Sequence, residues 1–166
     1  PGYAQQTGTQ STIEQEREAG GEPVGDLVVR HAPLHGVELP EELVPDMIDE
    51  FPVLFIAAAV ASGRTVVRGA AELRVKESDR LGATADMLRA NGVEAEIDGD
   101  DLIVNGKGRP VGGGTVTTHM DHRIAMSALV MGLASENAVQ IDDSAFIATS
   151  FPDFTGLMRS LGADLR

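Results

Sequence analysis

The chain has 166 residues, of which 42% are hydrophobic and 23% charged, proportions that are ordinary for a globular protein of one domain or two small ones. Its formal charge of −13 argues against binding to nucleic acids or to anionic membranes, because both need a basic protein surface. The chain has no cysteine, which excludes disulfides and thiol catalysis, and no apolar run of membrane-spanning length, so the cytoplasm is the expected location.

The first part of the chain differs in composition from the rest. Residues 1–23 are rich in Gln, Thr, Gly and Glu and offer little to bury, which predicts a flexible leader, a cloning remnant or the tail of an upstream segment. A folded pattern begins near residue 24. A strand is expected at 26–30 and a loop at 31–45, where the two histidines lack further ligands for a metal ion.

A buried helix and a strand are expected next. Residues 46–62 are predicted to be helical, with the regular part starting near Glu50 because Pro52 disfavours an earlier start. The second half of this helix, VLFIAAAVA at 53–61, is apolar on almost every side, which predicts burial on most sides. A strand is expected at 64–68.

Acidic and basic side chains are interleaved in the stretch ELRVKESDR at 72–80. A helix is expected to begin at its end, with Ser78 or Asp79 as the N-cap and helix formers continuing to Asn91. Cations beside a helix N-terminus make a binding site for an anion. A solvated, charged surface loop is the alternative interpretation of this stretch.

The remaining elements are expected to alternate between strands and helices. They are strands at 93–97 and 102–105 joined by a hairpin at 98–100, a Gly-rich connection at 106–114, a strand at 115–118, a helix at 121–135, a strand at 138–142, and a helix that ends before Gly162.

Two features recur at a spacing of about 70 residues. An aspartate leads a helix at Asp49 and again at Asp121. A helix ends in glycine at Gly92 and again at Gly162, and a short strand pattern follows each glycine. Helices and strands that recur at this period predict duplicated α/β units.

The second of these helices opens with two potentially cationic side chains. His122 and Arg123 follow Asp121 in the first turn, where cations oppose the helix dipole. An anion bound at that terminus would reverse the sign of this interaction. Arg80 stands in the first turn of its own helix, so two arginines, with Lys76 nearby, could clamp a carboxylate or a phosphate.

Carboxylates are available beside these cations. Asp49 and Glu77 are the candidates, and a carboxylate held among Lys and Arg in a dry cleft can transfer protons. Helix capping alone is the alternative role for Asp49 and for Asp121.

Four stretches resemble the motifs of one enzyme family, the enolpyruvylshikimate phosphate (EPSP) synthases. The resemblance extends from about residue 16 to the end of the chain, and the form of the first two of these stretches is similar to the bacterial subgroup that often tolerates glyphosate. The stretches are MIDEFP at 47–52, LRVKESDR at 73–80, DHRIAM at 121–126 and TSFPDF at 149–154.

The resemblance implies an activity and a fold. The activity is transfer of the enolpyruvyl group of phosphoenolpyruvate to the 5-hydroxyl of shikimate 3-phosphate, in the shikimate pathway of the bacterial cytoplasm, with no cofactor and with glyphosate as an inhibitor. The fold is α/β (α+β), with repeated βαβαββ units in an inside-out barrel. Residues 24–166 would supply roughly two units of one domain, about 24–106 and 107–166, and the other domain would be absent.

The resemblance also implies roles for single residues, and no metal ligand among them. Three would be catalytic: Asp49 as acceptor of the hydroxyl proton and as a substrate ligand, Glu77 as the second acid/base, and His122 as a hydrogen-bonding support. Three would bind substrate: Lys76 at shikimate 3-phosphate, and Arg80 and Arg123 at phosphoenolpyruvate.

The chain departs from the family pattern in two respects. Many members carry a lysine just before the C-terminal Ser/Thr-Phe-Pro, and Thr149 stands there instead. The whole other domain, which holds much of shikimate 3-phosphate, is also missing. Half a cleft cannot exclude water, so this chain alone is expected to have negligible turnover until it is paired with the complementary N-terminal fragment.

Three alternatives stay open. One is the related enolpyruvyl transferase that acts on UDP-N-acetylglucosamine, although the KESDR run at 76–80 argues against it. Another is a non-catalytic half-enzyme that serves as an interaction module for a partner chain. The third takes the charged runs as plain surface, and it predicts that Arg80 and Arg123 are exposed and do not converge.

Overall fold

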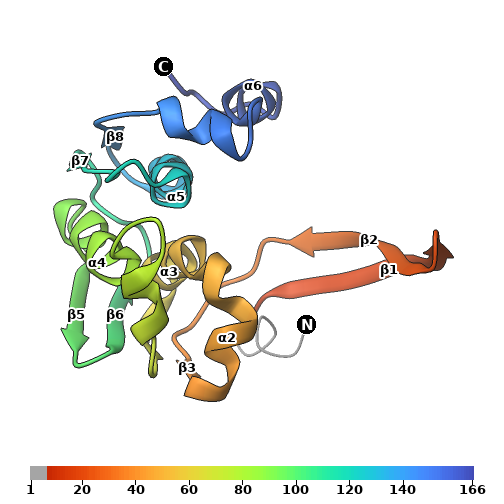
Figure 1. The fold of residues 1–166 in the computed structure, drawn as a ribbon, viewed down its shortest axis with the longest axis horizontal. Coiled ribbons are helices and arrows are strands. Elements are labelled where there is room, and N and C mark those ends of the chain that lie inside the picture. The colour runs from red at the N-terminus through yellow and green to blue at the C-terminus, as the bar shows by residue number, and fades with distance from the viewer. Residues whose placement is uncertain (1–6) are drawn as a thin grey trace.

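The computed structural model describes residues 7–166. Figure 1 shows a hairpin that projects from a central α/β unit, and a smaller unit that lies beyond α3 and α4. Within the described residues, no helix is long and apolar enough to cross a membrane. The elements are β1 (Gln10–Ala19), β2 (Glu22–Arg30), β3 (Glu38–Leu39), α2 (Val44–Met47), α3 (Phe51–Val60), β4 (Ser62–Val67), α4 (Arg80–Ala90), β5 (Glu94–Asp98), β6 (Asp101–Lys107), β7 (Thr115–Val116), α5 (His122–Ala134), β8 (Gln140–Ile141) and α6 (Phe154–Ser160).

The hairpin of β1 and β2 corrects one expectation. Residues 10–19 form a strand paired antiparallel with β2, where a flexible leader was predicted for residues 1–23. Almost all of the strand is exposed, and an exposed strand needs no alternation of apolar residues. Its sequence therefore carries no apolar pattern from which a strand could be predicted. Its backbone is held instead by the ladder to the Leu-Val-Val run of β2. Residues 1–6 of the expected leader lie outside the described residues.

The central unit has the element order βαβαββ, as the resemblance implies. Its four strands lie in the order β3-β4-β6-β5, with β3 parallel to β4 and the other pairs antiparallel. Helices α3 and α4 lie side by side next to this sheet (Figure 1). The core between them is made of buried apolar side chains, which include Phe51, Phe55, Leu81, Leu88, Leu102 and Val104.

The helix predicted at 46–62 is broken into three pieces. Helix α2 ends at Met47, a 3-10 turn called η2 (Ile48–Glu50) follows, and α3 begins at Phe51. Pro52 occupies the first turn of α3, where a missing N–H group is tolerated, so the regular helix starts close to the expected position. Asp49 therefore lies in η2 and caps no helix.

The C-terminal unit repeats part of the central one. Strands β7 and β8 are parallel, and α5 and α6 accompany them, so the order is βαβα. Both strands are shorter than predicted, with two residues each. Helix α5 contributes Ile124, Ala128 and Met131 to the core of the central unit, and Ile147 and Phe154 belong to a second cluster on its other side. This packing joins the two units through one helix.

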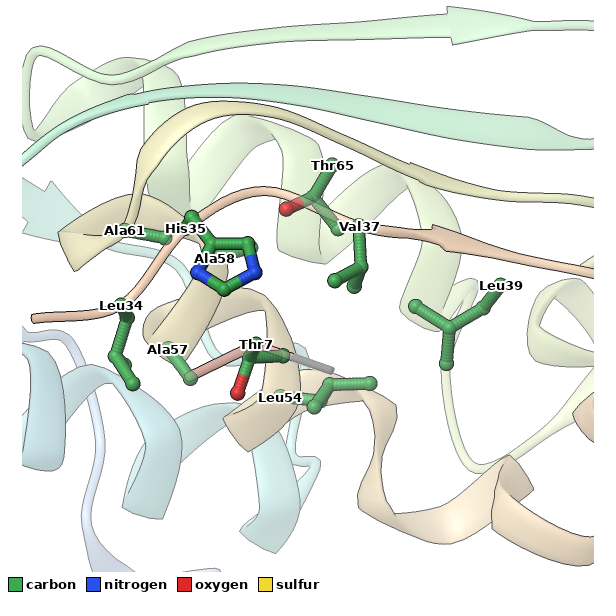
Figure 2. Close-up of a pocket in the computed structure, with 10 residues that line it drawn as sticks. All are labelled: Thr7, Leu34, His35, Val37, Leu39, Leu54, Ala57, Ala58, Ala61 and Thr65. Carbon is green, nitrogen blue, oxygen red and sulfur yellow. The ribbon is translucent and has the colours of Figure 1, made fainter. Parts of the chain in front are cut away.

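A small apolar pocket lies beside α3. It lies between α3 and the segment before β3, and Figure 2 shows it lined mainly by Leu and Ala side chains with His35 and Thr65. Its volume is about 20 Å³, room for one water and far less than a substrate needs. None of the site residues predicted from the sequence lines it.

A substitution at Gly106 should test the packing of β6 on α3. A Cβ atom there would collide with the carbonyl oxygens of Ala58 and Ala61 at the end of α3. Gly106→Ala is therefore expected to lower the free energy of unfolding by about 1–3 kcal/mol, as overpacking does. Urea unfolding measures this change.

The control for that experiment is the same substitution in a helix. A Cβ atom on Gly132 of α5 would meet Val139 at no less than 3.5 Å, an ordinary contact. Gly132→Ala should therefore be neutral or stabilising by up to about 1 kcal/mol, since alanine favours helix. Equal losses in the two variants would contradict the packing described for β6.

Candidate active site at the N-termini of α4 and α5

Helix α4 begins where the sequence predicts. Asp79 is its N-cap and accepts a hydrogen bond from the backbone N–H of Gly82 at 3.0 Å. Arg80 is the first residue of the helix, and its side chain is fully buried. The predicted cation is therefore present at this helix N-terminus, but it points into the protein.

Helix α5 also begins with an aspartate cap. The carboxylate of Asp121 accepts hydrogen bonds from the backbone N–H groups of Arg123 at 2.9 Å and Ile124 at 3.4 Å. Two residues with left-handed backbone precede this cap, His119 at φ 52° and Met120 at φ 60°. Non-glycine residues rarely adopt this conformation, so the turn that presents α5 is held in a strained form.

The turn before α5 is anchored to the segment after β8. One carboxylate oxygen of Asp142 accepts hydrogen bonds from the backbone N–H of Thr118 at 2.9 Å and from its hydroxyl at 2.8 Å. These two bonds hold the pKa of Asp142 below its usual value. The backbone N–H of Asp121 in turn donates to the carbonyl of Thr118 at 2.9 Å. The cap of α5 is thereby fixed to both parallel strands of its unit.

Three carboxylates surround the guanidinium of Arg80. Its Nε donates to Oδ2 of Asp121 at 2.8 Å, and its Nη1 donates to Oδ1 of Asp49 at 3.0 Å. Its Nη2 forms an ion pair with Oε2 of Glu77 at 2.5 Å. These carboxylates come from η2, from the stretch before α4 and from the cap of α5, so Arg80 joins three segments that are distant in the sequence.

Opposing effects act on the pKa of this arginine. Burial alone would lower the pKa of Arg80, but the hydrogen bond and charge of Asp121, followed by Glu77 and Asp49, outweigh burial and raise it. The guanidinium therefore keeps its charge inside the protein. A buried charge is tolerated only when it is paired in this way.

The same balance applies to Asp121. Burial alone would raise the pKa of its carboxyl group, but the ion pair with Arg80 and the bonds from the Ser78 hydroxyl and the Arg123 N–H outweigh burial. The pKa of Asp121 is held below its usual value, and the carboxylate stays ionised at neutral pH. The Ser78 hydroxyl lies 2.9 Å from Oδ2 of this carboxylate.

Arg123 reaches the same place from α5. Its Nη1 donates to the backbone carbonyl of Asp49 at 2.7 Å and to Oε1 of Glu50 at 3.3 Å. Its Nη2 lies 3.7 Å from Oδ2 of Asp49. One carboxylate group, that of Asp49, thus interacts with both arginines, through Oδ1 with Arg80 and through Oδ2 with Arg123.

Not every predicted residue joins this cluster. Lys76 and His122 are half-buried next to cluster residues in the sequence, and within residues 7–166 neither side chain forms a hydrogen bond or an ion pair. Thr149 is exposed, and its hydroxyl donates to the carbonyl of Phe146 at 2.7 Å. No group of three or more His, Asp or Glu residues in this range could hold a metal ion.

Three further residues belong to the cluster although no local sequence pattern indicates it. Asp121 was expected only to lead a helix, and its ion pair with Arg80 spans 41 residues. The sequence indicates Ser78 as a helix cap and Glu50 as a helix start, and in the structure both side chains contact the cluster. The spacing of about 70 residues places Asp49 and Asp121 at corresponding positions of the two repeats. This spacing is the one sequence signal that could have indicated that both carboxylates face one cation.

Acid is expected to destabilise the chain through carboxylates whose pKa is lowered by folding. The backbone N–H of Gly69 and the side chain of Arg68 lower the pKa of Asp101, as Thr118 does for Asp142. Such groups stabilise the fold above the unfolded pKa of about 3.9, and this stability is lost as the pH falls through the lower folded pKa. Urea midpoints should therefore drop below about pH 4, and Asp142→Asn should flatten that drop.

Comparison with known proteins identifies a family over most of the chain. A family model described as EPSP synthase (3-phosphoshikimate 1-carboxyvinyltransferase) matches residues 7–158. The chain belongs to the EPSP synthase family. The hairpin of β1 and β2 lies within the matched range, so it is part of the family segment.

Two relatives illustrate how the EPSP synthase family relates to this chain. A 3-phosphoshikimate 1-carboxyvinyltransferase from Granulibacter bethesdensis is 65% identical over 158 residues, which cover 95% of this chain and 35% of the relative. One from Bradyrhizobium diazoefficiens is 62% identical over 156 residues, which cover 93% of this chain and 33% of the relative. The chain thus spans about a third of the length of these relatives.

Solved structures show the same fold. An EPSP synthase from Acinetobacter baumannii superposes with a TM-score of 0.89 at 46% identity, over 96% of this chain and 37% of that chain. The enolpyruvyl transferase NikO from Streptomyces tendae gives a TM-score of 0.75 at 25% identity, over 99% of this chain and 35% of that chain. The predicted fold class, the α/β fold of enolpyruvyl transferases, is confirmed.

Proposed function

We propose that this chain forms part of the active site of a 3-phosphoshikimate 1-carboxyvinyltransferase. The full enzyme would transfer the enolpyruvyl group of phosphoenolpyruvate to the 5-hydroxyl of shikimate 3-phosphate and release phosphate. The observation that carries the proposal is the convergence of Arg80 and Arg123, from the N-termini of two helices, on the carboxylate of Asp49. Relatives at 62% and 65% identity that bear this enzyme name support it.

The proposed roles divide the cluster between binding and proton transfer. Arg80 and Arg123 bind the negative groups of phosphoenolpyruvate, because guanidinium groups hold carboxylates and phosphates with directed pairs of hydrogen bonds. Asp49 takes the proton of the 5-hydroxyl of shikimate 3-phosphate, and Glu77 exchanges a proton with the methylene carbon of phosphoenolpyruvate. In the complete enzyme, Lys76 contacts shikimate 3-phosphate and His122 supports the site by hydrogen bonding, since neither side chain has a partner within residues 7–166.

This arrangement suits an addition followed by an elimination. In the addition, the hydroxyl oxygen bonds to C2 of phosphoenolpyruvate while C3 gains a proton, which gives a tetrahedral ketal phosphate. In the elimination, C3 loses a proton and the C2–O bond to phosphate breaks. A proton donor and an acceptor are therefore needed on one carbon skeleton, with cations around the phosphate and carboxylate.

The chain alone is expected to show negligible turnover. It spans about a third of its relatives, and an incomplete cleft neither closes over substrates nor excludes water. Mixing it with the complementary N-terminal part of the Granulibacter relative should restore release of phosphate from phosphoenolpyruvate and shikimate 3-phosphate. Full activity of the chain alone would contradict the proposed need for the complementary fragment.

Asp49→Asn distinguishes the enzyme from a non-catalytic interaction module. The amide keeps the size of the side chain and can still accept a bond from Arg80, but it cannot take a proton, so turnover of the reconstituted enzyme should fall by about a hundredfold or more. Assembly with the complementary fragment should not change. Asp46→Asn, at an exposed position of α2, is the matched control and should have full activity. An Asp49→Asn enzyme as active as this control would overturn the assignment.

Substrate choice and inhibition need their own tests. Binding of shikimate 3-phosphate against UDP-N-acetylglucosamine decides between the two enolpyruvyl transferases, and the names of the matched relatives favour the first. Glyphosate as inhibitor and the bacterial cytoplasm as location stay predictions from the sequence.

A further inference from the structure

The three carboxylates on Arg80 differ sharply in their surroundings. The side chain of Asp121 is 0% exposed, whereas those of Asp49 and Glu77 are 48% and 52% exposed. The buried carboxylate therefore faces only protein. Asp49 and Glu77 are therefore the partners of Arg80 that solvent reaches.

We propose that Asp121 is a positioning residue that sets both phosphoenolpyruvate-binding arginines from a single buried carboxylate. The inference rests on the function proposed above and adds to it a residue that never touches a reactant.

Asp121 has no bonding capacity left for chemistry. Oδ2 accepts from Nε of Arg80 at 2.8 Å and from the Ser78 hydroxyl at 2.9 Å. Oδ1 accepts from the backbone N–H groups of Arg123 and Ile124, with Nη2 of Arg80 at 3.4 Å. Two carboxylate oxygens offer about four acceptor sites, and all of them are occupied. A role as a proton acceptor for substrate is thereby excluded, and orientation is the function that remains.

The hydrogen bonds to Asp121 fix the orientation of the guanidinium plane of Arg80. Asp121 accepts from Nε and, at 3.4 Å, from Nη2, which leaves Nη1 facing Asp49 and the other side of Nη2 facing Glu77. A guanidinium bound along one edge cannot rotate about its own axis, and its remaining donors point in fixed directions. The Nη groups that would bind phosphoenolpyruvate are therefore held in position before the substrate arrives.

The same carboxylate also sets Arg123. It caps α5 through the backbone N–H of Arg123 itself, so the start of that helix is tied to the position of Arg80. Misplacement of a binding group by about 1 Å is enough to lower rates about a hundredfold. One buried acid thus links two arginines that are 43 residues apart in the sequence.

Asp121→Asn isolates the charge from the cap. Asparagine caps helices as well as aspartate does, but it is neutral and offers one acceptor oxygen in place of two. In the reconstituted enzyme the KM for phosphoenolpyruvate is expected to rise about tenfold or more, while the KM for shikimate 3-phosphate changes by less than about twofold.

Asp79→Asn is the matched control. Asp79 is the corresponding cap of α4, its side chain is 51% exposed, and within residues 7–166 its carboxylate forms no ion pair with the guanidinium of Arg80. Both KM values should stay within about twofold of the parent. Ser78→Ala is the milder variant if Asp121→Asn does not fold, and it should raise only the KM for phosphoenolpyruvate, because it removes one donor to the same carboxylate.

An NMR measurement on this chain alone tests the role of Asp121 without relying on enzymatic turnover. The Nε–H group of Arg80, buried against Asp121, should give a slowly exchanging NMR signal that disappears in Asp121→Asn and persists in Asp79→Asn. If the parent enzyme fails to turn over the two substrates, the proposed function fails while this signal still tests Asp121. The proposal is overturned if Asp121→Asn keeps the signal, or if it alters both KM values equally.

Discussion

Arg80→Met is expected to lower the free energy of unfolding by about 3–5 kcal/mol, the usual effect of removing one partner from a buried ion pair. The reason lies with Asp121, whose carboxylate is fully buried and would be left without its cation. Asp49 and Glu77 are half-exposed, so water can replace the arginine at those two carboxylates. Binding of phosphoenolpyruvate should be lost in the same variant, since the donors of Arg80 are gone.

Arg74→Met is the control for this prediction. Arg74 also pairs with two aspartates, Asp79 at 3.5 Å and Asp100 at 3.1 Å, but all three side chains are at least a third exposed. Exposed ion pairs stabilise proteins by less than about 1 kcal/mol, so this variant should unfold nearly like the parent. Urea unfolding compares the two directly, and equal losses would show that Arg80 is not held as the structure describes.

A double variant tests the cause of the loss. Arg80→Met combined with Asp121→Asn removes both charges, and it should be more stable than Arg80→Met alone because no unpaired carboxylate stays buried. If the losses of the two single variants simply add, the buried pair is not what stabilises this region.

Local signals in the sequence account for the parts of the fold that were predicted correctly. Helices α4 and α5 are capped by Asp79 and Asp121, because a cap is a contact between residues two or three apart and is visible in the sequence. Helix α3 is buried on most sides, as its continuous apolar run predicts. The alternation of strands and helices expected from the sequence is present in both units, in the orders βαβαββ and βαβα.

Long-range contacts account for what the sequence missed. Strand β1 is polar along its length and is specified by its pairing with β2, which no pattern within residues 10–19 reveals. The placement of Asp49 depends on η2, a short turn that the sequence does not separate from the helix after it. Contacts between residues 41 apart, such as Asp121 with Arg80, appear only once the helices are packed.

The alternative that the charged runs are plain surface is contradicted by the structure. It requires Arg80 and Arg123 to be exposed and separate, but Arg80 is fully buried and both contact Asp49. The other interpretation of these runs is an anion-binding site at the helix N-termini. The convergence of Arg80 and Arg123 on Asp49 favours it.

Glu77→Gln is expected to separate binding from turnover. Oε2 of Glu77 lies 2.5 Å from Nη2 of Arg80, so this carboxylate lies against a donor that the carboxylate of phosphoenolpyruvate would otherwise use. Half of the Glu77 side chain is exposed although Arg80 is buried, so Glu77 is the partner that can move away and be replaced. Removal of the competing charge should tighten binding of phosphoenolpyruvate by about threefold to tenfold, the effect of roughly 1 kcal/mol.

Turnover should move in the opposite direction in this variant. The amide cannot exchange a proton with the methylene carbon, and loss of an acid/base group lowers rates by about a hundredfold to ten-thousandfold. Titration calorimetry with phosphoenolpyruvate and phosphate release in the reconstituted enzyme measure the two effects. Glu72→Gln, at an exposed position in the same charged stretch, should change neither. Weaker binding together with slower turnover would mean that Glu77 supports the arginine and does not compete with the substrate for it.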